Sequence, residues 1–328
     1  MWRVSSLLAT VPYARRFEEP IWLLGLFGRL RRFDAIHIHN RPQWVQMLRN
    51  LGFKGVLILH LHNDHVGHWP TGALNVLASQ VDAVVLCSDY LRRTFSSKSF
   101  ALNAKSQVVF NGVDVNVFRR RDEARAGRTI FFVGRIDEQK GVLQLVQAFE
   151  RVLDIHPEAN LIIGGATGFG KHQETAYTRR VRDLALRLCE EKNADIQFTG
   201  YLNHDRDLPM HFQKATLFAC PSMFQEPFGM VNVEAMACAT PVVASNRGGI
   251  PEVVGDAGKL VNPENTREFA DALAGLLSSP EECRRLGQAG YERCRELFDW
   301  NAVAKRWLQL VEAQVTRPRD YAATRLAV

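Results

Sequence analysis

Long apolar runs are absent from this sequence: no stretch approaches the ~20 apolar residues that a membrane-spanning helix needs. The N-terminus lacks the charged, apolar and small-residue regions of a signal peptide. The six cysteines are scattered and include no C-x-x-C pair, which argues against a disulfide framework or a cysteine zinc site. We therefore expect a cytoplasmic protein with reduced thiols.

Acidic residues are scarce in the first part of the chain. Residues 1–122 contain 16 Lys and Arg against 8 Asp and Glu, a net charge of +8, whereas residues 123–328 contain 25 against 27, a net charge of −2. The basic part is expected to meet an anionic partner such as phosphate groups or an acidic lipid surface. Its basic residues are not interleaved with aromatic ones, so we expect no nucleic-acid partner.

Length and periodicity indicate two α/β domains. The chain has 328 residues, more than one hydrophobic core usually serves. Short β-branched or apolar runs alternate with segments of helical periodicity, which is typical of parallel strands joined by crossover helices. The predicted strands are Asp34 to His39, Gly55 to Leu61, Asp82 to Ser88, Gln107 to Phe110, Thr129 to Val133, Asn160 to Gly164, Asp195 to Gly200, Thr216 to Cys220 and Pro241 to Ser245.

A polar stretch from Arg119 to Arg128 suits a linker between the two domains. We predict an N-terminal domain over 1–122, a second domain over 123–300, and a C-terminal helix and polar tail over 301–328. Both domains are expected to be doubly wound and Rossmann-like, facing one cleft, with ligands bound by the loops after the strands. No G-x-G-x-x-G follows the first predicted strand of either domain, which disfavours a nicotinamide dinucleotide.

The segment from Pro221 to Cys238 begins as a loop and is predicted to become a helix at its middle. Gly229 lets the backbone approach a ligand, so the amides of Gly229, Met230 and Val231 would face an anion. Glu226 lies before these amides and Glu234 about 10 Å further along the helix. Two carboxylates with phosphate-binding amides between them suit a nucleoside diphosphate sugar, with ribose at one end and hexose at the other.

Two cations follow the predicted strand Thr129 to Val133. Arg135 and Lys140 would lie at the carboxyl edge of that strand, where they can neutralise a diphosphate. In a transfer reaction they would stabilise the departing nucleoside diphosphate without a metal.

The motifs F-V-G-R-x-x-x-x-K-G, E-P-F-G-M-V-N-V-E-A-M-A-C-A-T-P-V-V-A-S and S-N-R-G-G-I-P-E-V-V together resemble the retaining glycosyltransferases of family 4. The resemblance implies the GT-B fold of two Rossmann-like domains. It further implies that Glu226 and Glu234 bind the donor sugar and ribose, that Arg135 and Lys140 bind the diphosphate, and that the donor is also contacted by Phe228, Gly229, Met230 and Val231. The segments N-R-P-Q-W-V and L-H-N, at Asn40 and Leu61, are similar to a spore-coat or envelope-associated branch.

Six of the ten histidines lie between His37 and His68. No HExxH motif and no second ligand cluster accompany them, so we expect no metal. The resemblance implies that His62 faces the donor hexose and takes part in catalysis with Glu226, Arg135 and Lys140. His37 and His39 are interpreted as either core or cleft-edge residues, and the acceptor or cleft residues are predicted to be His39, Asn40, Asn63 and Asn111.

The chain reaches the strand at Asp34 within thirty-odd residues, so the usual opening strand and glycine-rich loop of the family are expected to be missing or reduced. The segment Arg15 to Phe33 is instead predicted to be an apolar helix flanked by basic residues. Two interpretations remain open: it packs on the first sheet, or it lies on an anionic membrane.

Together these features predict a metal-independent retaining hexosyltransferase with a nucleotide sugar as co-substrate and no other cofactor. The acceptor would be a saccharide or lipid-linked hydroxyl used in cell-envelope synthesis, with peripheral contact at the inner face of the membrane left open. Two alternatives remain: a non-hydrolysing sugar-nucleotide epimerase, and a catalytically weak nucleotide-sugar-binding or assembly protein.

Overall fold

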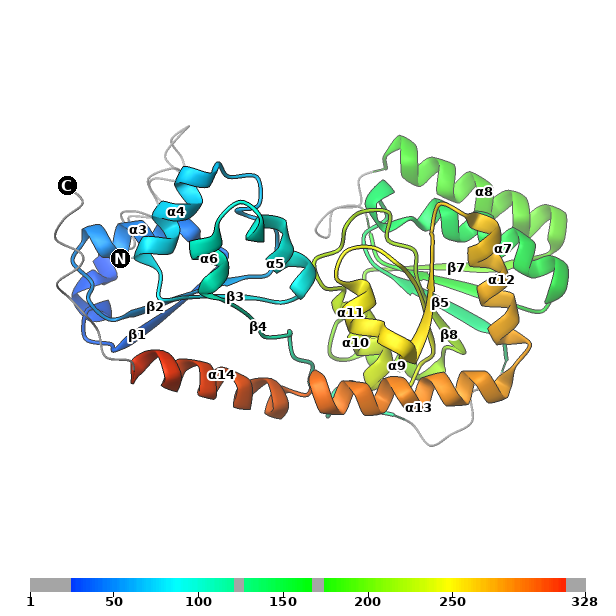
Figure 1. The fold of residues 1–328 in the computed structure, drawn as a ribbon. Helices are drawn as coiled ribbons and strands as arrows, with labels where there is room; N and C mark the ends of the chain where they lie inside the picture. Colours follow the sequence, from blue (N-terminus) through cyan, green and yellow to red (C-terminus); the bar gives the residue numbers. More distant parts are fainter. Residues whose placement is uncertain (1–24, 121–126, 167–173, 317–328) are drawn as a thin grey trace. The chain divides into compact units, whose positions relative to one another are not determined.

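The computed structural model describes residues 25–120, 127–166 and 174–316. The chain divides into two compact units (Figure 1). Unit 1 comprises Met1–Cys87, Leu91–Val109 and Lys305–Val328, and unit 2 comprises Ser88–Tyr90 and Phe110–Ala304. Each unit is built on a parallel sheet, as the alternation of apolar runs and helical segments predicts.

Unit 1 has a four-stranded parallel sheet in the order β1-β2-β3-β4. Its strands are β1 (Ala35–His39), β2 (Val56–Leu61), β3 (Ala83–Leu86) and β4 (Ser106–Val108). Helices α3 (Pro42–Asn50), α4 (Thr71–Gln80), α5 (Asp89–Ser96) and α6 (Phe100–Ala104) connect them. All residues of β2 and β3 are buried, which suits strands that are apolar throughout except for His60 in β2.

Arg49, on α3, hydrogen-bonds to the loops that precede strands β2 and β3 of unit 1. Arg49 donates to an Asp82 carboxylate oxygen at 2.6 Å and to the carbonyls of Phe53, Gly55 and Gln80. The other face of α3 buries Val45 and Leu48 completely. Apolar burial and charge-assisted hydrogen bonds therefore hold the same helix from two sides.

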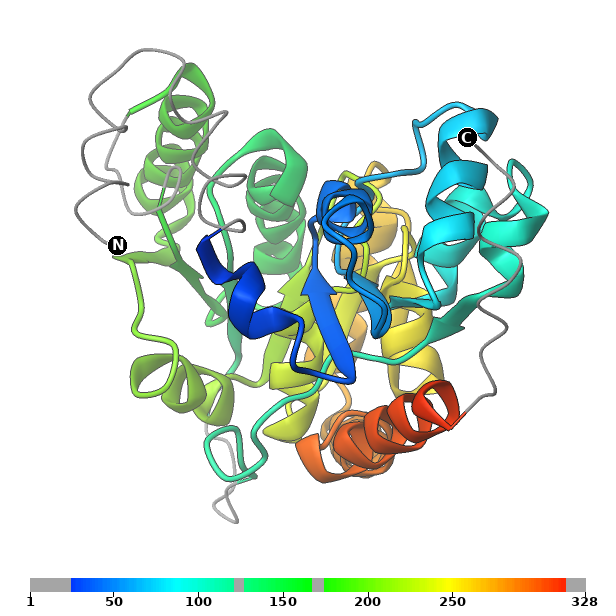
Figure 2. The ribbon, with the colours of Figure 1, turned by 90° about the vertical axis from the view of Figure 1, so that its left-hand side faces the viewer.

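The last described helix, α14 (Trp300–Val315), returns to unit 1 from Lys305 onward. Its Trp307 ring packs 4.3 Å from the His37 ring and 4.8 Å from the His60 ring, measured between centroids. Figure 2 shows β1 at the front of this sheet, with the helical residues 25–30 beside it and α14 below. Helix α14 thus packs against His37 and His60 on this face of the sheet.

Unit 2 has a six-stranded parallel sheet in the order β10-β9-β8-β5-β6-β7. The strands are β5 (Thr129–Val133), β6 (Asn160–Gly164), β7 (Asp195–Gly200), β8 (Leu217–Cys220), β9 (Val242–Ser245) and β10 (Gly258–Val261). The α-helices of this unit are α7 (Val142–Ile155), α8 (Ala176–Lys192), α9 (Asp207–Lys214), α10 (Met230–Ala237), α11 (Ile250–Val254), α12 (Thr266–Leu277) and α13 (Pro280–Leu297), with 3-10 turns at Glu138–Lys140 and Gly255–Ala257.

The core of unit 2 lies between its sheet and the helices that cover it. Strand β5 contributes Ile130 and Phe132, and α7 contributes a stripe that includes Val146 and Phe149, all buried. The spacing of apolar residues in α7 is the helical period that the sequence shows. This packing leaves the loops after the strands free to carry polar side chains.

The strand order reverses between β5 and β8. From β5 the chain proceeds outward to β6 and β7, and it then crosses to β8 and continues to β9 and β10 on the other side. Loops that follow the two central strands therefore leave in opposite directions and open a crevice at their carboxyl ends. The crevice is the position at which such sheets bind ligands.

The division of the chain differs from the expected boundaries of 1–122, 123–300 and 301–328. Residues from Phe110 onward already belong to unit 2, where the amide of Val113 donates to the carbonyl of Phe298 at 2.8 Å and Phe118 is buried. The tail helix is not separate, because its second part packs on unit 1. The polar stretch suggested a linker, but packing of the apolar residues just before it sets the boundary; residues 121–126 of that stretch lie outside the described residues.

Candidate active site

The loop after β5 is folded tightly against the loop after β8. Asp137 caps the 3-10 turn by accepting from the amide of Lys140 at 3.1 Å, and the carbonyl of Gln139 accepts from the amide of Met223 at 2.8 Å. Gly141 has a φ of 69°, and a Cβ at this position would collide with the carbonyl oxygen of Pro221. Glycine is therefore required here on two counts, backbone angle and close approach of the two loops.

This approach brings Lys140 and Glu226 into direct contact. Lys140 Nζ lies 2.6 Å from Glu226 Oε2, which also accepts from Ser222 Oγ at 3.3 Å. The ammonium group lies 4.9 Å from the centre of the Phe224 ring. Both charged side chains are about one fifth exposed, at 21% and 16%, so the pair is shielded yet open to a ligand. The two strands beside the crevice thus each supply one member of an ion pair.

Arg135 occupies the rim of the same loop. Its Nε lies 3.2 Å from an Asp137 carboxylate oxygen and its Nη2 donates to Gln139 Oε1 at 3.0 Å. The side chain is 37% exposed. Arg135 and Lys140 therefore present two cations from one short loop, as the sequence predicts, with the guanidinium at the more exposed position.

The loop that carries Glu226 is braced by the turn after β9. The amide of Gly249 donates to the carbonyl of Glu226 at 2.7 Å, and the amide of Gly248 donates to Gln225 Oε1 at 2.7 Å. Arg247 donates to the carbonyl of Met223 and pairs with Glu264. These contacts fix the main chain on both sides of the carboxylate and so orient it toward Lys140.

The predicted donor-binding run Phe228, Gly229, Met230 and Val231 forms the entry to α10. Phe228 is only 3% exposed, and its ring packs 5.9 Å from Phe110 and 5.8 Å from Phe298. Its side chain belongs to the aromatic core, so only its main chain is available to a ligand. Gly229 precedes the helix with a φ of 93°, and the half-exposed Met230 and Val231 form the first turn.

Glu234, on α10, is buried at 4% exposure. Its Oε1 lies 3.1 Å from Nε2 of His204, while its Oε2 has no hydrogen-bond partner. Desolvation makes an unpaired carboxylate oxygen unfavourable, and a ligand hydroxyl would satisfy it. The carboxylate is therefore held on one side and available on the other.

His204 is a site residue that sequence reasoning did not identify. It follows β7 in the segment Asn203, His204, Asp205, which carries no recognisable motif. The hydrogen bond with Glu234, and after it the contact with Asp205 Oδ1 at 2.6 Å from Nδ1, together raise the pKa of His204 to about 9 against the opposing effect of desolvation. The ring is thus cationic at neutral pH and partly balances the buried carboxylate.

The predicted residues of unit 1 form a group of their own at the ends of β1 and β2. His39 Nδ1 lies 3.0 Å from His62 Nε2, and the amide of His62 donates to Asn40 Oδ1 at 2.8 Å. Asn40 adopts a φ of 51°, and its own amide donates to the carbonyl of His60. Asn63 follows as an exposed loop residue, whereas Asn111 lies in unit 2 and is half-buried. His39, Asn40 and His62 are therefore brought together, whereas their assignment as cleft residues stays a prediction.

Two further histidines adjoin this group. Desolvation, together with the smaller effects of the neighbouring His62, His37 and His39, lowers the pKa of His60 to about 2. Desolvation, together with the smaller effects of His39 and His62, lowers the pKa of His37 to about 4. Both imidazoles are accordingly neutral near neutral pH.

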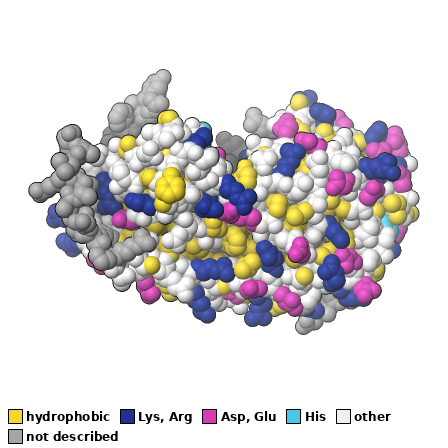
Figure 3. Space-filling model, viewed as in Figure 1, with side chains coloured by type: hydrophobic (Ala, Val, Ile, Leu, Met, Phe, Trp, Pro, Cys, Tyr) yellow, Lys and Arg dark blue, Asp and Glu magenta, His cyan; other side chains and the backbone are white. Residues whose placement is uncertain are grey.

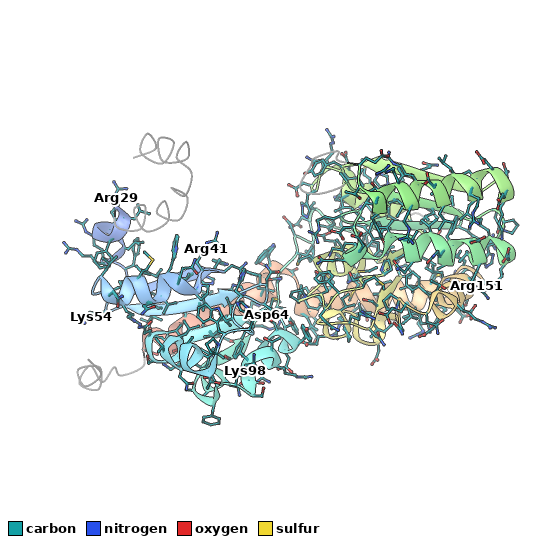
Figure 4. The ribbon with its side chains drawn as sticks, turned by 90° about the horizontal axis from the view of Figure 1, so that it is seen from above. Arg29, Arg41, Lys54, Asp64, Lys98 and Arg151 are labelled. Atoms are coloured by element: carbon teal, nitrogen blue, oxygen red, sulfur yellow. The ribbon has the colours of Figure 1, made fainter. Side chains whose placement is uncertain are left out.

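Basic side chains of unit 1 come from several segments. Figure 4 labels Arg29, Arg41, Lys54 and Lys98, which project from different parts of the unit and do not gather at one point. Unit 2 shows acidic and basic side chains interspersed on the face in Figure 3, in keeping with its small net charge. Of the predicted helix over Arg15 to Phe33, residues up to 24 lie outside the described residues, and residues 25–30 are helical. None of the helices in the described ranges has the length and apolarity to cross a membrane.

Comparison with known proteins relates both halves of the chain to sugar-transferring enzymes. Residues 116–293 match the family described as Glycosyl transferases group 1, and residues 5–117 match Glycosyltransferase Family 4. The chain is 30% identical over 317 residues to Spore coat protein SA of Bacillus subtilis, covering 90% of this chain and 82% of that protein. It is 35% identical over 255 residues to alpha-maltose-1-phosphate synthase of Mycolicibacterium smegmatis, covering 70% and 62% of the two chains.

Solved structures share the fold. A glycosyltransferase from Rickettsia africae superposes with a TM-score of 0.77 at 18% identity, covering 91% of this chain and 83% of that one. The Anabaena protein HepE, solved in complex with UDP and glucose, superposes with a TM-score of 0.72 at 21% identity, covering 89% and 81%. The predicted GT-B architecture of two Rossmann-like domains is confirmed.

Proposed function

Because the chain belongs to the group 1 and family 4 glycosyltransferases and is thus a nucleotide-sugar-dependent transferase, we propose that it moves a hexose with retention of configuration. The donor is a nucleoside diphosphate hexose. The acceptor is a hydroxyl of a saccharide or lipid-linked saccharide used in cell-envelope synthesis, a role supported by the similarity to Spore coat protein SA.

The contact between Lys140 and Glu226 carries this proposal. It lies at the carboxyl ends of β5 and β8, where the strand order reverses and α/β sheets bind ligands. A diphosphate entering here meets Lys140 and Arg135, which lie on one loop of unit 2. Charge that develops on the departing diphosphate is stabilised by these two cations, since they are already oriented before the reaction.

The two carboxylates, Glu226 and Glu234, would bind different sugars of the donor, the hexose and the ribose. Glu226 lies beside Lys140 and would bind hydroxyls of the hexose close to the diphosphate. Glu234 would accept from the ribose hydroxyls through its unpaired Oε2, while His204 holds Oε1. The main-chain amides at Gly229, Met230 and Val231 precede Glu234 and suit the phosphates between the two sugars.

The reaction uses front-face attack, in which the departing phosphate oxygen accepts the proton of the acceptor hydroxyl. The bond from the anomeric carbon to the phosphate oxygen breaks, and the bond to the acceptor oxygen forms on the same face. His62 contacts the donor hexose in this proposal, and the Asn40 hydrogen bond to its amide orients the main chain at that position. His39, Asn63 and Asn111 remain predicted acceptor or cleft residues.

A donor panel tests the proposal. UDP-, GDP- and ADP-hexoses are each incubated with the protein and candidate saccharide acceptors, and the products are analysed by mass spectrometry and by the anomeric coupling in NMR. We expect one nucleotide family to give a glycoside with the donor's anomeric configuration. Isomerised donor without transfer would select the epimerase alternative, and binding without turnover would select an assembly protein.

A further inference from the structure

We propose that His37, His39 and His60 of unit 1 form a binding site for one divalent transition-metal ion, with Zn²⁺ as the preferred ion and His62 as an outer-shell partner. This site goes beyond the transfer reaction and reverses the sequence-based expectation of no metal. It shares His39 and His62 with the residues of unit 1 predicted for the acceptor and the hexose, but the proposed diphosphate and ribose contacts of unit 2 do not depend on it.

The sheet itself brings the three imidazoles together. His37 and His39 are two residues apart on β1 and so point to the same face, and His39 pairs in register with His60 on the adjacent β2. One ring nitrogen of each of the three residues lies within 4.8 Å of the others. The cluster therefore follows from strand register and not from a local sequence motif.

His60 is the observation that points to a ligand. Its side chain is only 4% exposed, and neither Nδ1 nor Nε2 has a hydrogen-bond partner. A buried imidazole without a partner is unfavourable, because both nitrogens have lost their hydrogen bonds to water. A metal ion would satisfy one nitrogen by direct coordination.

The surroundings of the cluster resemble those of a metal centre. His39 uses Nδ1 for its 3.0 Å contact with His62, so we assign its Nε2 to the ion. A ligand histidine whose second nitrogen is held by a neighbour is the usual outer-shell arrangement. The Trp307 ring of α14 packs on His37 and His60 and so shields one side of the cluster.

The chemistry of the ligands selects the ion. Three imidazoles without a carboxylate suit Zn²⁺, Cu²⁺ or Ni²⁺ and do not suit Mg²⁺ or Ca²⁺. Zinc bonds of about 2.0 to 2.1 Å in tetrahedral geometry place ligand nitrogens about 3.4 Å apart, so ring rotations must shorten nitrogen separations that now reach 4.8 Å by up to about 1.4 Å. The ion can enter because His37 and His39 are exposed and line a cavity of about 530 Å³.

Metal titration of the untagged full-length protein tests the site. After treatment with EDTA and dialysis, Zn²⁺ is titrated in a calorimeter, and Co²⁺ is added as a spectroscopic probe of ligand geometry. We expect one equivalent to bind tightly and Co²⁺ to give the visible absorption of a four- or five-coordinate site. Failure to bind one equivalent, or a Co²⁺ spectrum like that of the aqueous ion, would overturn the proposal.

Variants assign the ligands. His62→Ala removes the outer-shell partner and should weaken Zn²⁺ binding by ~10–100-fold. His37→Ala/His39→Ala changes two exposed side chains that bind the ion directly, so it should weaken Zn²⁺ binding by more than that. His65→Ala/His68→Ala, which changes two nearby histidines outside the cluster, is the matched control and should bind as the unmodified protein does. Thermal unfolding by circular dichroism verifies that each variant is folded. Equal losses in the two double variants would contradict the assignment.

Discussion

His204 Nε2 lies 3.1 Å from Glu234 Oε1, although the two residues are 30 positions apart in the chain. The contact joins the segment after β7 to α10 and leaves the second carboxylate oxygen of Glu234 without a partner. A buried anion is thus stabilised by a cation that is itself largely exposed, at 59% against 5% for the two side chains. The ion pair between His204 and Glu234 therefore links the stability of unit 2 to the protonation of His204 at the predicted ribose site.

This pair predicts a pH dependence for the stability of unit 2. The pKa of His204 is raised from 6.5 to about 9, chiefly by its hydrogen bond to Glu234. The stabilisation is therefore fully present below pH 6.5 and is lost as the pH rises through about 9, because only the protonated ring pairs with the carboxylate. His204 is exposed, so we expect a contribution of only about 1 kcal/mol to the free energy of unfolding.

Urea unfolding of the unmodified protein and His204→Gln at several pH values measures this contribution. The difference between the two proteins should be largest below pH 6.5 and should vanish above about 9. His204 faces Glu234 and Asp205, and its ring meets the Phe118 ring in a T-shaped contact. Asp205→Asn removes only the exposed partner and serves as control. A difference that does not change with pH would contradict the ion pair.

The two cations after β5 are expected to act on the transition state. Arg135→Ala or Lys140→Ala should lower kcat/KM through the loss of about 2 to 4 kcal/mol of transition-state stabilisation, since each removes one cation that faces the departing diphosphate. Lys140→Ala also leaves Glu226 without its ion-pair partner, so Lys140→Arg tests rescue by charge. Steady-state kinetics provides the measurement, with Lys259→Ala as a control away from this loop. Turnover within a few-fold of the unmodified protein would refute the assignment.

The two carboxylates are expected to differ in what they recognise. Glu226→Gln should reduce discrimination between hexoses while affinity for the free nucleoside diphosphate is kept. Glu234→Gln should weaken the free nucleotide as well, because the ribose end of the ligand loses its acceptor. Calorimetric titration with nucleoside diphosphate alone separates the two effects. An equal loss of affinity in both variants would show that the ends of the donor are wrongly assigned.

Gly141 offers a structural prediction with a matched control. Gly141 and Gly200 share a φ of 69°, but a Cβ at Gly141 collides with the Pro221 carbonyl, whereas nothing lies within 4 Å of one at Gly200. Gly200→Ala should therefore cost about 1 kcal/mol of backbone strain. Gly141→Ala should cost more, by about 1 to 3 kcal/mol for the close contact, and should also lower activity by moving Lys140. Chemical denaturation of both variants gives the comparison, and equal destabilisation would show that the loops can separate freely.

Local pattern determined much of the fold. The predicted bounds of β5, β6 and β7 coincide with the observed Thr129–Val133, Asn160–Gly164 and Asp195–Gly200, and the tail helix is present over Trp300–Val315. Strand and helix periods are properties of consecutive residues, so they can be read without knowing what each element touches. The short strand β10, Gly258–Val261, was not predicted, because its four residues include Gly and Lys and carry little of the strand pattern.

The motifs likewise placed Arg135, Lys140, Glu226 and Glu234 on the loops and helix that the structure describes in unit 2. Which of these side chains meet was decided by tertiary structure: the contact of Lys140 with Glu226 needs strands β5 and β8 to be neighbours, and residues 86 positions apart have no shared local pattern. His204 was not predicted for the same reason, since its contact with Glu234 joins residues 30 positions apart.

Tertiary packing alone also decided the fate of the histidines and the limits of the units. Sequence periodicity places His37 and His39 on one face of a strand, but only the register of β1 with β2 brings His60 to them. Helix α14 packs on unit 1 through the contacts of Trp307 with His37 and His60, residues more than 240 positions away in the chain. The composition and hydrophobic periodicity of a segment determine which secondary structure it can form. Which of its side chains are buried, and which residues they contact, depends on the distant segment that packs on it, so only the tertiary structure decides this.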